Sequence, residues 1–254
     1  MSLWSQKRKT IISATILIPL LFVIGFLYLS TREAPSCFDG VQNNDEAGID
    51  CGGSCIALCQ NNTLEPVILW SRFVPVINDV YSVVAMIENP NLNAEAYNAP
   101  YSFKLYDEDN ILIYERKGSA FIPSGAQIPI FEHALRTGER IPVRSTFEFR
   151  EDPYWEQAST DGRVLSIVSK NIDEESRLPR LVSVVKNISQ KNLHSISFVA
   201  LLFDKDDNLV NASRTLLENL SPEDSDTLVF TWPESFDREI VKIEIIPVEY
   251  TIGQ

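Results

Sequence analysis

The chain has 254 residues, and its 35 acidic and 22 basic residues give a formal net charge of −13 at pH 7. A nucleic-acid-binding surface needs basic residues to neutralise phosphate, so this composition argues against a nucleic-acid partner. The length fits about two domains of ordinary size after an N-terminal segment of different composition.

That N-terminal segment is basic and then strongly apolar. Residues 1–10 carry Lys7, Arg8 and Lys9, and residues 11–30 contain no charge. As an α-helix rising about 1.5 Å per residue, the uncharged run would span about 30 Å, the thickness of the hydrocarbon core of a bilayer. The positive-inside rule then predicts a cytoplasmic tail over 1–10, a single lipid-contacting transmembrane helix over 11–30, and all later residues outside the cytoplasm.

Two other interpretations of this segment are a cleaved signal peptide and a lipoprotein signal that modifies Cys37. The apolar run exceeds the 7–15 residues that are typical of a signal peptide, and no good small-x-small cleavage site follows it. The residues before Cys37, Ala-Pro-Ser, are a poor match to a lipoprotein signal. The sequence therefore favours an uncleaved membrane anchor.

All four cysteines fall within residues 37–59, at Cys37, Cys51, Cys55 and Cys59. A module of this size cannot bury enough apolar surface to fold by burial alone, so it needs covalent or metal cross-links. Outside the cytoplasm two disulfides are expected, with three connectivities open. A zinc site is the alternative, although the C-x3-C-x3-C spacing differs from the usual C-x2-C pairs.

The same module is rich in side chains with hard oxygen ligands. A calcium site formed by these acids is a further hypothesis, although they do not fit the D-x-[DN]-x-[DN]-G loop. The competing interpretation is that Asp, Asn and Gly simply form tight turns. The calcium candidates are Asp39, Asp45, Glu46 and Asp50.

The pattern C-x-D-G-x-x-N-x-x-E-x-G-x-D-C-G-G-x-C, from Cys37 to Cys55, resembles a short motif of bacterial secreted and surface proteins. The final spacing, to Cys59, is one residue longer than in that motif. The resemblance implies a location outside the cell and no enzymatic activity.

The rest of the chain carries an internal repeat at an offset of 98 residues, which aligns Asn89 with Asn187 and Asn110 with Asn208. Short runs with period-two alternation predict strands, and the Asp/Asn clusters between them predict hairpin turns. The expected fold is mainly β, with two tandem immunoglobulin-like sandwiches of about seven strands over residues 63–150 and 163–250, joined by a linker over 151–162. Strands are predicted over 67–73, 81–88, 101–106, 111–115, 143–150, 163–169, 181–186, 195–203, 209–212 and 240–246.

The segment Phe103-Lys104-Leu105-Tyr106-Asp107 resembles the signature of the FxLYD family of bacterial extracytoplasmic immunoglobulin-like domains. The second unit has a degraded copy over residues 200–204, which lacks the first Phe. The resemblance implies a fold and a location, but a fold does not by itself imply a function.

No motif of a hydrolase, a P-loop, a dinucleotide site or a metalloprotease occurs, and the sequence predicts no catalytic residue, cofactor or enzymatic activity. Trp155 is expected either to wedge the two units together or to face a partner. The strand over 195–203 is apolar on both faces, which predicts double burial or a contact surface.

The predicted function is that of an anchored extracytoplasmic binding or structural protein, with a protein partner at a sandwich edge. The alternative is an accessory subunit of a membrane-bound envelope or secretion assembly.

Overall fold

The structure is a computed structural model that describes residues 3–30, 35–158, 164–173 and 178–252. The chain divides into two compact units, Met1–Cys55 and Ile56–Gln254. The first unit holds one helix and part of the cysteine module, and the second holds all the named strands.

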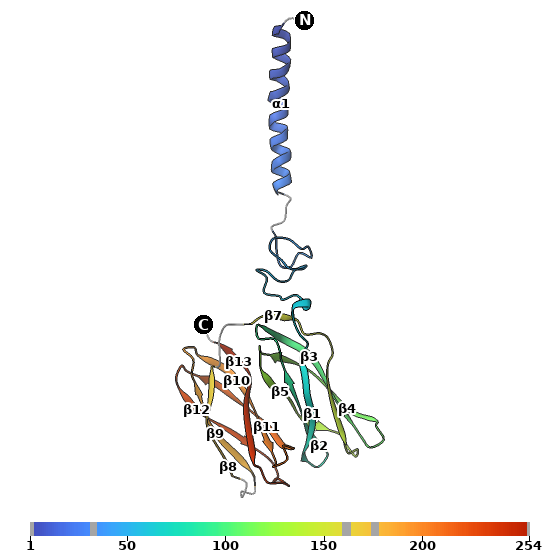
Figure 1. The fold of residues 1–254 in the computed structure, drawn as a ribbon, viewed down its shortest axis with the longest axis vertical. Helices are drawn as coiled ribbons and strands as arrows, with labels where there is room; N and C mark the ends of the chain where they lie inside the picture. The colour runs from blue at the N-terminus through green and yellow to red at the C-terminus, as the bar shows by residue number, and fades with distance from the viewer. Residues whose placement is uncertain (1–2, 31–34, 159–163, 174–177, 253–254) are drawn as a thin grey trace. The chain divides into compact units, whose positions relative to one another are not determined.

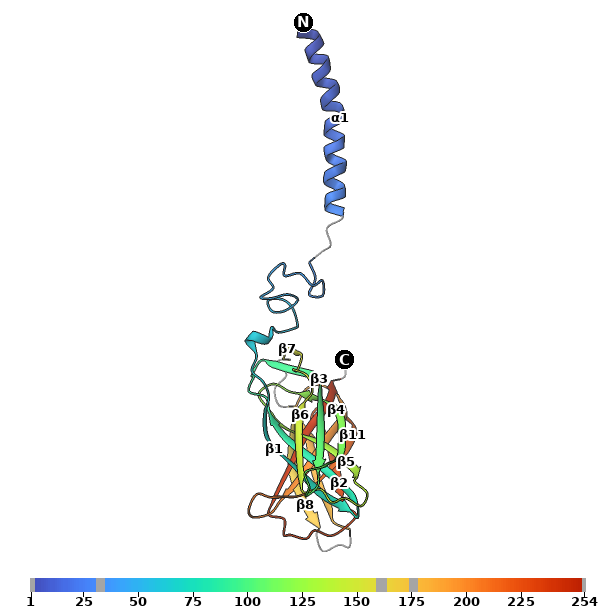
Figure 2. The same cartoon turned by 90° about the vertical axis from the view of Figure 1, so that its right-hand side faces the viewer.

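The helix α1 runs from Leu3 to Ser30 and contains Pro19. Its axis changes direction midway along its length, as Figure 2 shows, and a proline inside a helix is a usual cause of such a bend. Side chains are described for Arg8 and for residues 11–27, and the large apolar ones are exposed, with Phe22 at 78%. Within the described part of the chain, no helix meets the length and hydrophobicity expected of a membrane span.

The first sandwich comprises the strands from β1 to β7. One antiparallel sheet has the order β1-β2-β5, and the other has the order β4-β3-β6, with β7 paired to β3 (Figure 1). A 3₁₀ helix, η1 (Gln60–Asn62), precedes β1. The strands are β1 (Val67–Ile77), β2 (Val80–Glu88), β3 (Ala94–Tyr106), β4 (Leu112–Ile122), β5 (Gln127–Arg136), β6 (Arg144–Phe149) and β7 (Trp155–Gln157).

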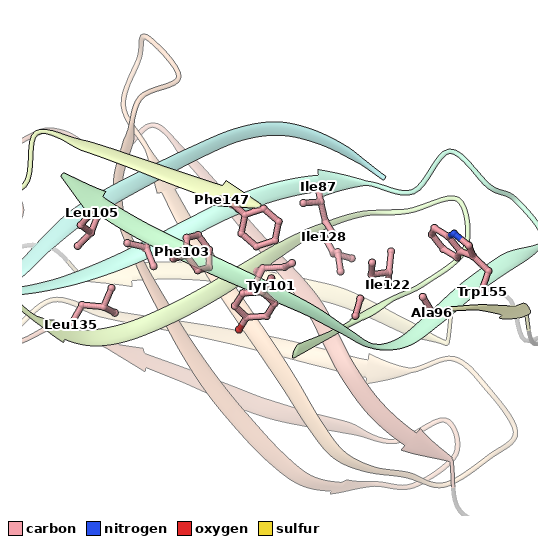
Figure 3. Close-up of a cluster of buried hydrophobic side chains, with 14 of the residues drawn as sticks. Ile87, Ala96, Tyr101, Phe103, Leu105, Ile122, Ile128, Leu135, Phe147 and Trp155 are labelled. Atoms are coloured by element: carbon pink, nitrogen blue, oxygen red, sulfur yellow. The ribbon is translucent and has the colours of Figure 1, made fainter. Parts of the chain in front are cut away.

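The core of this sandwich lies between its two sheets (Figure 3). Phe103 and Leu105 project inward from β3 and are fully buried, because alternate residues of a strand share one face. Phe147 from β6 meets Phe103 edge to face, with ring centroids 5.0 Å apart. Phe and Leu of the FxLYD segment are therefore core residues.

The second sandwich repeats the arrangement with the strands from β8 to β13. Its sheets have the orders β12-β9-β8 and β11-β10-β13, and every pairing is antiparallel. The strands are β8 (Leu165–Asp173), β9 (Arg180–Asn187), β10 (Leu193–Phe203), β11 (Leu209–Leu220), β12 (Ser225–Thr231) and β13 (Lys242–Ile252).

Strand β10 is buried on both faces, as its apolar sequence predicts. Phe198 and Leu202 lie in the core of the second sandwich, whereas Leu201 and Phe203 lie in a third apolar cluster. We call this third cluster the inter-sandwich cluster. It joins the sheet β1-β2-β5 to the sheet β11-β10-β13 and consists of Val74, Val84, Met86, Phe131, Val199, Leu201, Phe203, Leu209 and Ala212, flanked by Trp70, Ile246 and Val248.

The expectation of a mainly β chain is confirmed. The first sandwich has seven strands when β7 is counted, and the described part of the second has six. Three strands, β5, β7 and β12, are absent from the sequence-based prediction. Part of the segment expected as a linker belongs to the first sandwich instead, because Trp155 of β7 is buried in its core. Residues 159–162 of that segment lie outside the described part of the chain.

Candidate functional site

All four cysteines of the 37–59 module are oxidised. Cys37 is bonded to Cys55, with 5.7 Å between their Cα atoms, and Cys51 and Cys59 are disulfide-bonded as well. No free thiol exists in the chain. The prediction of two disulfides is thus confirmed, and a thiolate zinc site is ruled out for this oxidised form.

Two candidate calcium ligands, Asp39 and Asp50, accept hydrogen bonds from nearby N–H groups. Asp50 accepts from the backbone N–H of Asp39 at 3.0 Å and from that of Gly40 at 2.9 Å. Asp39 accepts from the Asn43 amide at 2.8 Å and from the Val41 backbone N–H at 2.9 Å, and these two bonds hold the pKa of its carboxyl below the usual range. Both carboxylates therefore stabilise the turns of the module.

The other two candidates form separate contacts. Asp45 accepts a hydrogen bond from the Ser54 hydroxyl at 2.8 Å, and Glu46 accepts one from the backbone N–H of Asn43 at 3.1 Å. Gly53 has a φ of +61° and lies so close to the Asp45 carbonyl that a Cβ would be 2.1 Å from its oxygen, which explains the glycine there.

Among the described residues, one group of three possible metal ligands comes within 4.8 Å, and it consists of Cys37, Glu46 and Cys55. The two sulfurs are bonded to each other, so they are not available as thiolates. The four calcium candidates do not form such a group in the described part of the chain. The calcium site stays a hypothesis without a converging ligand set.

We predict that the module depends on its bridges. Between residues 35 and 55 the buried residues are only Gly52 and Cys55, so apolar burial contributes little. Replacing both Cys37 and Cys55 by Ser should cost about 3 kcal/mol of local stability, the value expected for a loop of similar length. An endoproteinase specific for Asp should then cut the module much faster than in the parent chain. Ser54→Ala is the matched control, and equal cutting rates in all three proteins would contradict the prediction.

The internal repeat has a structural basis in two buried asparagines. Asn89 donates to the Ala94 carbonyl at 2.8 Å and the Pro123 carbonyl at 2.9 Å. Asn187 donates to the Lys191 carbonyl at 2.8 Å and the Leu220 carbonyl at 3.0 Å. Each side-chain oxygen also accepts from the backbone N–H two residues later. The same asparagine thus organises the same turn in both sandwiches.

A second repeated feature is a buried aspartate in the hairpin between β3 and β4 and in that between β10 and β11. Asp107 accepts from the backbone N–H of Ile111 at 2.8 Å and pairs with Arg140. Asp204 accepts from the backbone N–H of Asn208 at 2.9 Å and pairs with Arg238 at 2.9 Å. The last residue of the FxLYD segment therefore closes a turn, which is a structural role.

The electrostatics of these two carboxyls agree with that role. Desolvation works to raise the pKa of Asp204, but backbone N–H groups, the Asn208 amide and the Arg238 guanidinium outweigh it and lower the pKa to about 2. For Asp107, desolvation is again opposed by the Ile111 backbone N–H and by Arg140, and the pKa is lowered.

We predict an acid-sensitive contribution to stability from Asp204. A carboxyl whose pKa is lower in the folded than in the unfolded chain stabilises the fold fully at a pH above the unfolded-chain pKa, which is about 4 for aspartate. This contribution is lost as the pH falls from about 4 to about 2, the pKa of Asp204 in the folded chain. Asp204→Asn should therefore flatten the decline in unfolding free energy over this range, measured by urea titration at several pH values. Asp206→Asn, at an exposed position in the same turn, is the control and should decline like the parent chain.

The inter-sandwich cluster is flanked by two clefts. One, of about 410 Å³, is lined by residues of β1, β6, β11 and the loops before β6, β11 and β13. The other, of about 350 Å³, is lined by residues of both sandwiches that include Tyr97, Tyr101, Arg214 and Glu249. Tyr101 donates to the Glu132 carboxylate at 2.8 Å, and its burial raises its pKa.

Neither histidine lines either of these two clefts. His133 stacks on Phe131 with ring centroids 6.1 Å apart, and His194 bonds the Asn219 side chain at 2.5 Å. Trp155 packs in the first core and Trp232 in the second, while Trp70 flanks the inter-sandwich cluster.

These features define a mainly β, disulfide-bonded protein with two packed sandwiches. No family model matches the chain, and no curated protein matches it. Among solved structures, the transglutaminase of red sea bream is similar at 10% sequence identity with a TM-score of 0.24. The match covers 72% of this chain and 31% of the transglutaminase, so the chain spans less than a third of that enzyme's length.

Proposed function

We propose that the chain is a membrane-anchored protein that displays two immunoglobulin-like sandwiches outside the cytoplasm for a binding or structural role without catalysis. The observation that carries the proposal is the apolar surface of α1. Its large apolar side chains from Ile11 to Leu27 are exposed, within an uncharged run over residues 11–30. A helix that is apolar all round needs an apolar surrounding, and a bilayer supplies one.

The oxidised cysteines support the placement outside the cytoplasm. Disulfides persist in oxidising compartments, whereas cytoplasmic thiols are normally kept reduced. The chain has no other cysteine that would need protection from oxidation. The basic residues before the run then belong on the cytoplasmic side.

The sandwiches support a binding or structural role in two ways. They form one compact unit through the inter-sandwich cluster, which would keep a displayed surface rigid. Their sheets also end in edge strands such as β4 and β8, where an extended segment of a protein partner could add as a further strand.

The anchor is tested by the double variant Leu20→Lys/Ile24→Lys, compared with Leu20→Ala/Ile24→Ala. On the insertion scale each lysine costs about 2.5–3.5 kcal/mol, so two nearly cancel the roughly 4–8 kcal/mol contributed by the apolar residues. The lysine variant should leave the membrane fraction on alkaline extraction, while the alanine variant should remain. If the parent chain is itself extracted, the proposal is wrong.

Two further measurements test on which side of the membrane the sandwiches lie and whether the helix is only an anchor. Protease added to intact cells should digest the sandwiches of the parent chain. Replacing residues 11–30 by an unrelated membrane helix should then leave the biological phenotype unchanged if the helix is only an anchor. Loss of the phenotype would favour the alternative of an accessory subunit whose helix contacts a membrane assembly.

A further inference from the structure

The 410 Å³ cleft beside the inter-sandwich cluster is lined by basic side chains, although the protein is acidic. Three arginines line it, Arg72, Arg144 and Arg238, and no carboxylate is among its lining residues. The chain as a whole has 35 acidic and 22 basic residues. Guanidinium suits oxyanions because its planar fork of N–H donors matches the geometry of carboxylate and phosphate groups.

Each arginine comes from a different element and is held at one side by a neighbour. Arg72 of β1 donates to the Asp207 carbonyl at 2.8 Å. Arg144 of β6 lies over the Tyr106 ring at 4.1 Å and donates to the Asn110 side-chain oxygen at 2.5 Å.

The third arginine, Arg238, precedes β13 and pairs with Asp204 at 2.9 Å and with Asp237 at 3.6 Å. A guanidinium has five N–H donors, so each of the three keeps donors for a ligand. Among the described residues, Arg72 and Arg144 contact a carbonyl, an amide oxygen and aromatic rings, and neither is in an ion pair.

The rest of the lining suits an oxygen-rich ligand. The hydroxyls of Ser71 and Ser145 lie 3.2 Å apart, and the Asn208 side chain adds an amide group. Phe73 and Leu209 supply apolar walls, which reduce the exposure of a bound anion to water and strengthen its contacts with the guanidinium groups.

We propose that this cleft binds a small multivalent oxyanion, a ligand that carries phosphate or carboxylate groups, through bidentate contacts with Arg72 and Arg144. Arg238, whose charge is already paired with Asp204, contributes its remaining N–H donors from the second sandwich, so the bound anion touches both sandwiches. This site is independent of the membrane anchor, because every residue that lines it belongs to Ile56–Gln254.

The test is calorimetric titration of the full chain in detergent with inorganic pyrophosphate and, separately, with citrate. The two probes separate phosphate from carboxylate ligands. We expect saturable 1:1 binding of at least one of them, weakened by salt. Arg144→Gln should weaken this binding about tenfold, the effect of losing one charge-assisted contact.

Arg150→Gln is the matched control, because it removes the same charge from an exposed position just beyond the other end of β6. It should bind like the parent chain. Arg144→Lys keeps the charge but loses the planar fork, so an intermediate affinity is expected, and this variant serves if Arg144→Gln fails to fold. Absence of saturable binding to both probes, or equal affinities for the Arg144 and Arg150 variants, would overturn the proposal.

Discussion

Replacing Leu201 by aspartate is expected to uncouple the two sandwiches. Leu201 is fully buried on the face of β10 that forms the inter-sandwich cluster. Truncating such a side chain to alanine costs about 2–5 kcal/mol, and a buried carboxylate without a partner costs more. Leu202, its neighbour, faces the core of the second sandwich, so the substitution at 201 acts on the inter-sandwich cluster directly.

The chain provides its own probes for this experiment, because Trp155 is buried in the first core and Trp232 in the second. Fluorescence of Trp155→Phe and Trp232→Phe variants, each also carrying Trp4→Phe and Trp70→Phe, therefore reports on the opposite sandwich during urea unfolding. The parent background should give one common midpoint, and Leu201→Asp should give two. Leu216→Asp, at a position that is 63% exposed on β11, is the control. A single common midpoint for Leu201→Asp would mean that the cluster does not couple the sandwiches.

The strands that sequence reasoning finds are those whose apolar residues alternate or run without interruption. The segment around Phe147 alternates, and it forms β6. Strand β5 is not predicted because Pro129 interrupts it. In addition, Ile128 and Ile130 belong to the core of the first sandwich and Phe131 to the inter-sandwich cluster, so the apolar residues of the strand do not alternate with a single period. Strand β5 is an edge strand, where a proline is tolerated.

The boundary between the sandwiches is harder to predict because it depends on contacts that are distant in sequence. The sequence of residues 151–157 is mostly polar and shows no strand periodicity. Trp155 is nevertheless buried in the core of the first sandwich, because β7 pairs with β3. The backbone of Leu58 also bonds to the Trp155 carbonyl at 2.9 Å, almost a hundred residues away in the chain. Local propensity carries no information on such a contact.

The arginine cleft also could not be predicted from the sequence. Arg72, Arg144 and Arg238 are widely separated in sequence and belong to no motif. Arg72 and Arg144 lie on β1 and β6 of the first sandwich, and the packing of the second sandwich on the first adds Arg238. The repeated asparagines are the opposite case. The offset of 98 residues points to Asn89 and Asn187 directly, although their burial is visible only in the fold.

Replacing Asn187 by alanine is expected to cost about 2–4 kcal/mol of unfolding free energy. The fully buried side chain satisfies the carbonyls of Lys191 and Leu220 and the N–H of Ser189, and a buried polar group without a partner costs about 1–3 kcal/mol. Asn171→Ala, at an exposed position on β8, is the control and should change stability by about 0.5 kcal/mol or less.

Asn187→Asp separates hydrogen bonding from shape. Aspartate has nearly the same shape, but at neutral pH it turns two donors into an acceptor that faces two carbonyls, so it should destabilise the chain at least as much as alanine. Asn89→Ala should have a similar effect on the first sandwich, because Asn89 makes the corresponding bonds. Urea unfolding followed by fluorescence measures all four variants. If Asn187→Asp were as stable as the parent chain, the turn would be held by its backbone alone, and the repeated asparagine would have no part in specifying the fold.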